Sequence, residues 1–143
     1  MSDTAQATPG VFLHECEIPV RWGDLDALGH VNNTVFFRFM EQVRVEWLDR
    51  QAVVCNQDQR EVPVLVQASC TFLQPINYPA SVRVKLYADQ PGRSSIVTRY
   101  ELRDVADGRL YATGEAKAVW IDLATGKSAP LPEALRALAN GEA

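Results

Sequence analysis

Residues 21–33 read RWGDLDALGHVNN, and residues 34–50 continue as TVFFRFMEQVRVEWLDR. The second segment has the period of an amphipathic helix. Its apolar stripe, at positions i, i+4, i+7 and i+11, consists of Phe36, Met40, Val43 and Trp47. This stripe is widened by the flanking apolar residues Phe37, Phe39, Val45 and Leu48. We therefore expect a sheet to curl around the helix and not merely to cover one side of it.

Five other segments have the period of two that is typical of half-buried strands. These segments are 12–22, 64–72, 82–88, 96–102 and 110–120. The alternate apolar positions that we expect to be buried include Phe12, Trp22, Val64, Val66 and Phe72. Short connections rich in Pro, Gly and Asn separate the last four segments, so they are predicted to form an antiparallel meander. A short terminal helix is predicted over 132–138, with proline in its first turn.

The chain has 143 residues, which predicts a single domain over residues 1–143. The formal net charge is −4 and Lys and Arg do not cluster, so neither nucleic acid nor a membrane surface is an expected partner. The polar N-terminus lacks the layout of a secretion signal, and no apolar stretch is long enough to span a bilayer. We expect a cytoplasmic protein.

The three cysteines Cys16, Cys55 and Cys70 are odd in number and lack CxxC spacing, which indicates neither a disulfide framework nor a zinc site. Cys16 and Cys70 fall on apolar strand positions and are interpreted as small buried residues, with a catalytic thiol as the alternative. His14 lies on the apolar face of its strand and is interpreted as a core histidine. Glu41 is expected to form an ion pair with a nearby helix arginine.

Asp24, Asp26 and His30 form the densest group of titratable side chains in the chain, and Gly23 and Gly29 are expected to let the backbone bend sharply between them. The carboxylates have two interpretations, as turn or capping groups and as catalytic acids. His30 is interpreted as a supporting residue that orients a neighbour by hydrogen bonding. A metal site built from these three side chains would lack a fourth ligand, which makes it the less favoured hypothesis.

Asn32 and Asn33 directly precede the predicted helix, so one of them is expected to be its N-cap. Backbone N–H groups at a helix N-terminus have no partner within the helix and can bind an oxyanion. A capped helix that binds nothing is the simpler alternative. A carboxylate beside such a terminus could cleave an ester-like bond without a metal and without a Ser or Cys nucleophile.

The segment Trp22–Asn33, followed by Phe36-Phe37 and Glu41-Gln42-Val43-Arg44, closely resembles the acyl-CoA thioesterases of the 4-hydroxybenzoyl-CoA thioesterase type. The resemblance covers roughly residues 12–122, the expected core of the domain. It implies an α+β hot-dog fold, in which a five-stranded antiparallel sheet wraps around one long helix. The implied activity is hydrolysis of an acyl-CoA to the free acid and CoA.

The resemblance also implies roles for individual residues. Asp26 corresponds to the catalytic carboxylate, acting as nucleophile or as general base, and the backbone N–H of Asn33 corresponds to the group that polarises the carbonyl. His30 supports catalysis. The implied substrate-binding residues are Gly29, Asn32, Arg93 and Ser94, the last two in a hairpin that approaches the pantetheine or nucleotide. No cofactor and no metal are implied.

Proteins of this kind pair at their sheet edges, which implies a homodimer or homotetramer with the pocket between Asp26 of one subunit and strands of the other. The acyl chain, and its delivery by CoA or by acyl-carrier protein, are left open by the sequence.

Two rival functions share the expected fold. Hot-dog hydratases carry a Gly-Asp-x-Asn-Pro-x-His turn, whereas Asp24 is followed here by Leu25-Asp26-Ala27 and His30 comes one residue late. A non-catalytic acyl-CoA binding module would use the same helix N-terminus without activating water. The presence of Asp26 argues mildly against this module.

Overall fold

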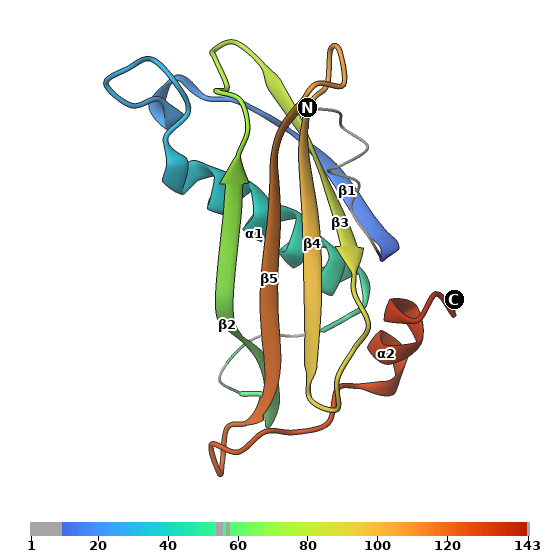
Figure 1. The fold of residues 1–143 in the computed structure, drawn as a ribbon. Coiled ribbons are helices and arrows are strands. Elements are labelled where there is room, and N and C mark those ends of the chain that lie inside the picture. The colour runs from blue at the N-terminus through green and yellow to red at the C-terminus, as the bar shows by residue number, and fades with distance from the viewer. Residues whose placement is uncertain (1–9, 54–55, 57, 143) are drawn as a thin grey trace.

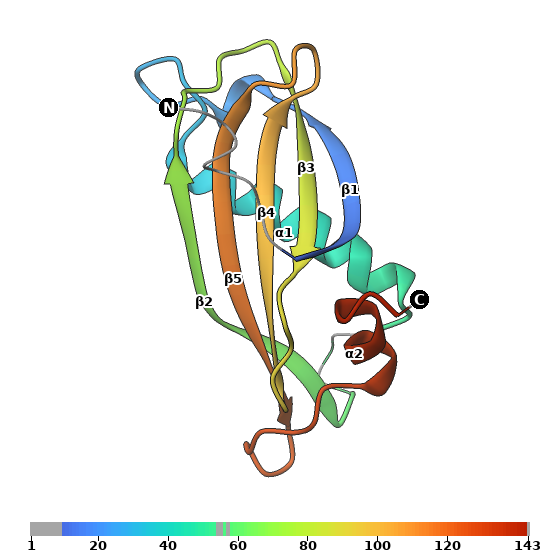
Figure 2. The same cartoon turned by 45° about the vertical axis from the view of Figure 1, so that its right-hand side comes forward.

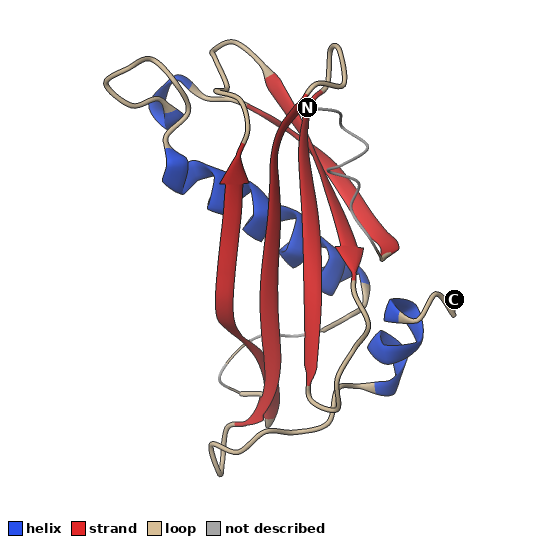
Figure 3. Ribbon diagram, in the orientation of Figure 1, coloured by secondary structure: helices blue, strands red, loops and turns tan. Residues whose placement is uncertain are grey.

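The computed structural model describes residues 10–53, 56 and 58–142. Its elements, in chain order, are β1 (Val11–Pro19), the 3-10 helix η2 (Trp22–Asp24), α1 (Asn33–Arg50), β2 (Glu61–Phe72), β3 (Ser81–Ala88), β4 (Ser95–Asp104), β5 (Leu110–Asp122) and α2 (Glu133–Ala139). Figure 3 shows one long helix lying across a single sheet. The predicted α+β hot-dog architecture is confirmed.

The strands form one antiparallel sheet in the order β1-β3-β4-β5-β2. The meander predicted for the last four strands is correct for β3, β4 and β5 but wrong for β2, which pairs with β5 at the far edge (Figure 1). The segment after β2 therefore crosses the end of the sheet. Ile76 in this segment is fully buried, and its carbonyl accepts a hydrogen bond of 2.9 Å from the Val31 N–H. A buried anchor in the connection, together with pairing to β5, outweighs the local preference for a hairpin.

The helix α1 crosses the concave face of the sheet, which curves around it (Figure 2). All four residues of the predicted apolar stripe are buried. Close packing is possible where Gly114 of β5 faces Met40, because a Cβ atom at Gly114 would lie 2.7 Å from the Met40 Sδ. The prediction that the sheet curls around the helix is confirmed, but the cover expected for all the flanking apolar residues is wrong for Phe37 and Val45, which are 37% and 45% exposed on the side of α1 away from its buried stripe.

The first strand is shorter than predicted, and two of its expected core residues are exposed. A register irregularity between Phe12 and His14 shifts Phe12 out of the alternation, and its side chain is 50% exposed. β1 ends at Pro19, and Trp22 lies in η2 with 76% exposure. The prediction of burial for these two residues was wrong, because a bulge and a 3-10 turn break the period of two.

The apolar residues of β2 are also more exposed than predicted. Val64, Val66 and Phe72 are 37%, 54% and 43% exposed. The reason is the position of β2 at the sheet edge, where an antiparallel neighbour covers it on one side only. Within this chain, α1 covers β2 where the ring of Phe36 packs edge-on against Phe72, with ring centroids 4.9 Å apart.

The terminal helix α2 begins one residue later than predicted, with Pro132 as its N-cap residue. Its buried residues Leu135 and Ala139 join the hydrophobic core. Within the described ranges, no helix combines the length and the apolar character needed to cross a membrane.

Candidate active site

The first acid of the turn, Asp24, is a buried structural group. Its Oδ2 accepts a hydrogen bond of 2.9 Å from the backbone N–H of Arg21, and its Oδ1 accepts one of 3.1 Å from the Arg21 guanidinium. These bonds close η2 at its N-terminus. The sequence allowed Asp24 to be a turn or capping group or a catalytic acid, and these contacts support the turn or capping role.

The chain reverses its direction between Asp24 and the start of α1. The Asn32 N–H donates to the Asp24 carbonyl at 2.9 Å, and the Asp26 N–H donates to the His30 carbonyl at 2.8 Å. Gly29 permits the reversal because its φ is +80°, a conformation that residues with a Cβ rarely adopt. The loop thereby places Asp26 beside the residues that lead into α1.

The second acid, Asp26, is half-buried and held at one oxygen only. Its Oδ1 accepts hydrogen bonds from the Leu28 N–H at 2.9 Å and from the His30 N–H at 3.4 Å. Among the described residues, no group donates a hydrogen bond to Oδ2. One oxygen therefore orients the carboxylate, while the other is available as a nucleophile or a base.

The helix begins with Asn32 as its N-cap, as expected for one of the two asparagines. The Asn32 backbone is extended (φ −60°, ψ 141°), and its side-chain oxygen accepts from the Thr34 N–H at 3.0 Å. The N–H of Asn33, the first helical residue, has no acceptor in the part of the chain that the structure describes. This N–H and the positive end of the helix dipole are available to an oxyanion.

The predicted site residues do not all lie together. Asp26, Gly29, His30, Asn32 and Asn33 share one loop and the helix start that follows it.

Arg93 and Ser94 lie at the other end of the sheet. The Asp26 loop adjoins the start of β3, where the Val20 N–H donates to the Ala80 carbonyl at 2.8 Å. The hairpin with Arg93 follows the other end of β3, and the eight residues of that strand span about 26 Å. The Arg93 carbonyl is held there by Leu131 N–H at 2.9 Å and by Arg136 at 3.0 Å. Within one chain, this hairpin therefore lies far from the Asp26 loop, and substrate binding by Arg93 and Ser94 stays a prediction.

The remaining titratable candidates have structural surroundings. His14 Nε2 lies 3.1 Å from Glu46 Oε1 of α1, so this histidine is satisfied, as predicted. Glu41 pairs with Arg38 at 3.2 Å on the exposed face of α1.

The thiols of Cys16 and Cys70 are not activated. Burial, joined at Cys16 by the charges of Glu46 and Glu15, raises the pKa of each thiol to about 11, so both are protonated at neutral pH. Cys55 lies outside the described residues. In the described ranges, no three His, Cys, Asp or Glu side chains are grouped as metal ligands.

One polar contact could not be read from the sequence. Arg44 of α1 donates a hydrogen bond of 3.0 Å to the hydroxyl of Tyr100, which lies 56 residues away on β4. From the sequence, Arg44 was expected only as a possible ion-pair partner of Glu41. No local signal links a helix residue to one particular strand residue.

A sheet wrapped around a helix that follows an acid-bearing turn is the arrangement of the hot-dog thioesterases. The model of the thioesterase-like superfamily matches residues 20–138. The chain belongs to this superfamily, and it is a thioester hydrolase.

Individual relatives support this membership. The PA2801 protein of Pseudomonas aeruginosa is 41% identical, with a TM-score of 0.83, over 88% of this chain and 97% of that one. A Thermus thermophilus thioesterase solved with coenzyme A and Zn is 31% identical, with a TM-score of 0.77, over 92% and 95% of the two chains. The acyl-acyl carrier protein thioesterase ATL2 of Arabidopsis thaliana is 27% identical over 112 residues, which are 77% of this chain and 60% of that protein.

Proposed function

We propose that this protein is an acyl-CoA thioesterase that releases a free acid and CoA. The observation that carries the proposal is the Asp26 carboxylate, anchored through Oδ1, in the loop that ends at the N–H of Asn33; neither Oδ2 nor this N–H has a partner among the described residues. CoA as the carrier is supported by the Thermus thermophilus relative, whose structure contains coenzyme A.

The chemistry requires two groups. Oδ2 of Asp26 either attacks the thioester carbonyl, giving a mixed anhydride that water then hydrolyses, or removes a proton from the attacking water. In both routes the carbonyl oxygen gains negative charge and the CoA sulfur leaves as a thiolate that takes up a proton. The Asn33 N–H stabilises the oxyanion, a contribution of about 3 kcal/mol. His30 acts here as a positioning residue through its main chain, because its backbone N–H donates to Oδ1 of Asp26.

The direct test is thiol release from a panel of short, medium, long and aromatic acyl-CoAs, with an acyl-carrier-protein thioester as a further arm. We expect saturable CoA release from at least one acyl-CoA. Turnover of an enoyl-CoA without thiol release would contradict the proposal in favour of a hydratase. Saturable binding with no hydrolysis of any thioester would contradict it in favour of a binding module.

We also propose that two copies pair along β2. This strand lies at the sheet edge and carries the exposed apolar residues Val64, Leu65, Val66 and Phe72. Leu65 lines a pocket together with the exposed Phe37 of α1, so the apolar surface continues onto the helix. An open edge that carries apolar side chains is suited to pairing with another strand. Pairing of two β2 strands about a twofold axis would bring the partner's Arg93 hairpin to the end of the sheet that holds Asp26. Arg93 and Ser94 would then serve the site of the other subunit.

Replacing Val66 with Lys tests this assembly. Val66 is 54% exposed on β2, so a charge there should impair edge pairing more than it impairs the fold of one chain. We expect the mass measured by light scattering to fall from an oligomer toward a monomer, and thioesterase activity to fall with it. Leu123→Lys is the matched control, because Leu123 is 45% exposed and lies beyond β5. An unchanged mass for Val66→Lys, or a monomeric wild type, would contradict pairing along β2.

A further inference from the structure

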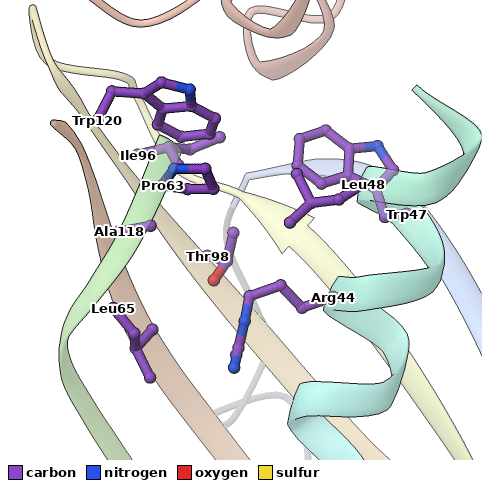
Figure 4. Close-up of a pocket in the computed structure, with 9 residues that line it drawn as sticks. All are labelled: Arg44, Trp47, Leu48, Pro63, Leu65, Ile96, Thr98, Ala118 and Trp120. Atoms are coloured by element: carbon purple, nitrogen blue, oxygen red, sulfur yellow. The ribbon is translucent and has the colours of Figure 1, made fainter. Parts of the chain in front are cut away.

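A small cavity lies between the second half of α1 and the sheet (Figure 4). Its volume is about 140 Å³, close to the roughly 150 Å³ that accommodates benzene in an engineered protein cavity. Most of its walls are apolar, formed by Trp47, Leu48, Pro63, Ile96, Ala118 and Trp120. The two indole rings lie at one end of the cavity, and the guanidinium of Arg44 lies at the other (Figure 4).

A buried chain of hydrogen bonds holds Arg44 in place. Arg44 Nη1 donates to the Tyr100 hydroxyl at 3.0 Å, which lies 2.7 Å from the Thr98 hydroxyl, and Thr98 Oγ1 donates to the Ala116 carbonyl at 3.3 Å. Because Thr98 uses its proton on Ala116, the Tyr100 hydroxyl donates to Thr98 and accepts from Arg44. The guanidinium is thus fixed by groups that are themselves buried.

The charge of Arg44 is not balanced within the described residues. No described carboxylate forms an ion pair with it, although Arg38, Arg60 and Arg99 all have such partners. Arg44 is half-buried, and four of its five N–H groups have no protein acceptor among the described residues. A cation at one end of an apolar cavity is best matched by a carboxylate, which can accept two parallel hydrogen bonds from a guanidinium.

We propose that this cavity binds a small arylcarboxylate, with the ring between Trp47 and Trp120 and the carboxylate on Arg44. The ring is favoured over a flexible alkyl chain because the cavity has the volume of one benzene and its far end is lined by two indoles. Arg44 lies about 16 Å along the α1 axis from Asn33, so this ligand does not occupy the oxyanion position. The site is a binding site in its own right, independent of whether the protein hydrolyses acyl-CoA.

The test is direct binding of phenylacetate, followed by tryptophan fluorescence and by calorimetry. Two of the three tryptophans line the cavity, so saturable binding should change the emission of the wild-type protein. Arg44→Met keeps an apolar chain of similar length without the charge, and should weaken phenylacetate binding by about tenfold to a hundredfold. Arg50→Met is the matched control, because Arg50 is exposed at the end of the same helix and does not line the cavity.

A second variant removes the cavity and keeps the charge. Ala118→Leu fills the space beside Ile96 and should abolish phenylacetate binding. Far-UV circular dichroism and Tm measurements check that each variant is folded. The neutral analogue 2-phenylethanol should bind weakly, and equally to wild type and Arg44→Met. Equal phenylacetate binding by wild type and Arg44→Met would overturn the proposal, as would no saturable binding to wild type or tighter binding of hexanoate. These measurements need no turnover, so a failure to hydrolyse acyl-CoA would overturn the proposed function and leave this site standing.

Discussion

Replacing Asp26 with Asn is expected to lower kcat for acyl-CoA hydrolysis by about a thousandfold or more. The amide oxygen still accepts the hydrogen bond from the Leu28 N–H, so the loop keeps its shape. The open oxygen position, however, loses its negative charge, and an amide neither attacks the thioester carbonyl nor accepts a proton from water. The measurement is the rate of thiol release at saturating acyl-CoA.

The matched control is the same chemical change two residues earlier. Asp24 makes its bonds to Arg21 within the chain, so Asp24→Asn should act mainly on stability. We expect the Tm of Asp24→Asn to fall while kcat changes much less than in Asp26→Asn. Equal kcat values for Asp26→Asn and wild type would remove Asp26 from the mechanism.

Replacing Asn33 with Pro is expected to lower kcat by about a hundredfold to a thousandfold, the effect of losing one oxyanion donor. Proline removes the backbone N–H of Asn33 and little else. The first helical position accepts proline well, and the extended conformation of Asn32 (φ −60°, ψ 141°) is the one that a residue before proline prefers.

The companion variant Asn33→Ala distinguishes the contribution of the Asn33 backbone N–H to catalysis from that of its side chain. It keeps the N–H and removes only an exposed side chain, so its kcat should stay close to wild type. The pair is measured by thiol release, with Tm as the check on folding. If Asn33→Pro were folded and as active as wild type, the Asn33 N–H would not be the oxyanion donor. If Asn33→Ala alone lost activity, the side chain would have a role that the proposed mechanism lacks.

The helix and the acid-bearing loop were predictable because their signals are local. The stripe from Phe36 to Trp47 repeats with the helical period, and an asparagine before such a stripe is a common N-cap. Of the two glycines expected to let the chain bend, Gly29 has a φ of +80°, whereas Gly23 does not have a positive φ. The sequence left open which of Asp24 and Asp26 was structural, since both are carboxylates in one turn. Only the contacts of Asp24 with Arg21 assign it that role.

The errors concern contacts between segments distant along the chain. Alternation predicted that β2 is a strand, but alternation is the same in a central and in an edge strand, so it predicted burial where Val66 is exposed. The burial of Phe12 was predicted wrongly because a bulge shifts this residue out of the alternation, and the amino-acid composition does not indicate the bulge.

Local patterns in the sequence were enough to predict the long helix, an asparagine N-cap at Asn32 or Asn33, the loop that carries Asp26 and the family that these features share. Each depends on interactions within a few residues, where spacing and side-chain chemistry suffice. Three further facts became visible only in the folded chain: β2 lies at the sheet edge, the Arg93 hairpin and the Asp26 loop lie at opposite ends of β3, and Arg44 contacts Tyr100. These facts depend on which strands pair, and pairing is settled by the packing of the whole core, which no local pattern encodes.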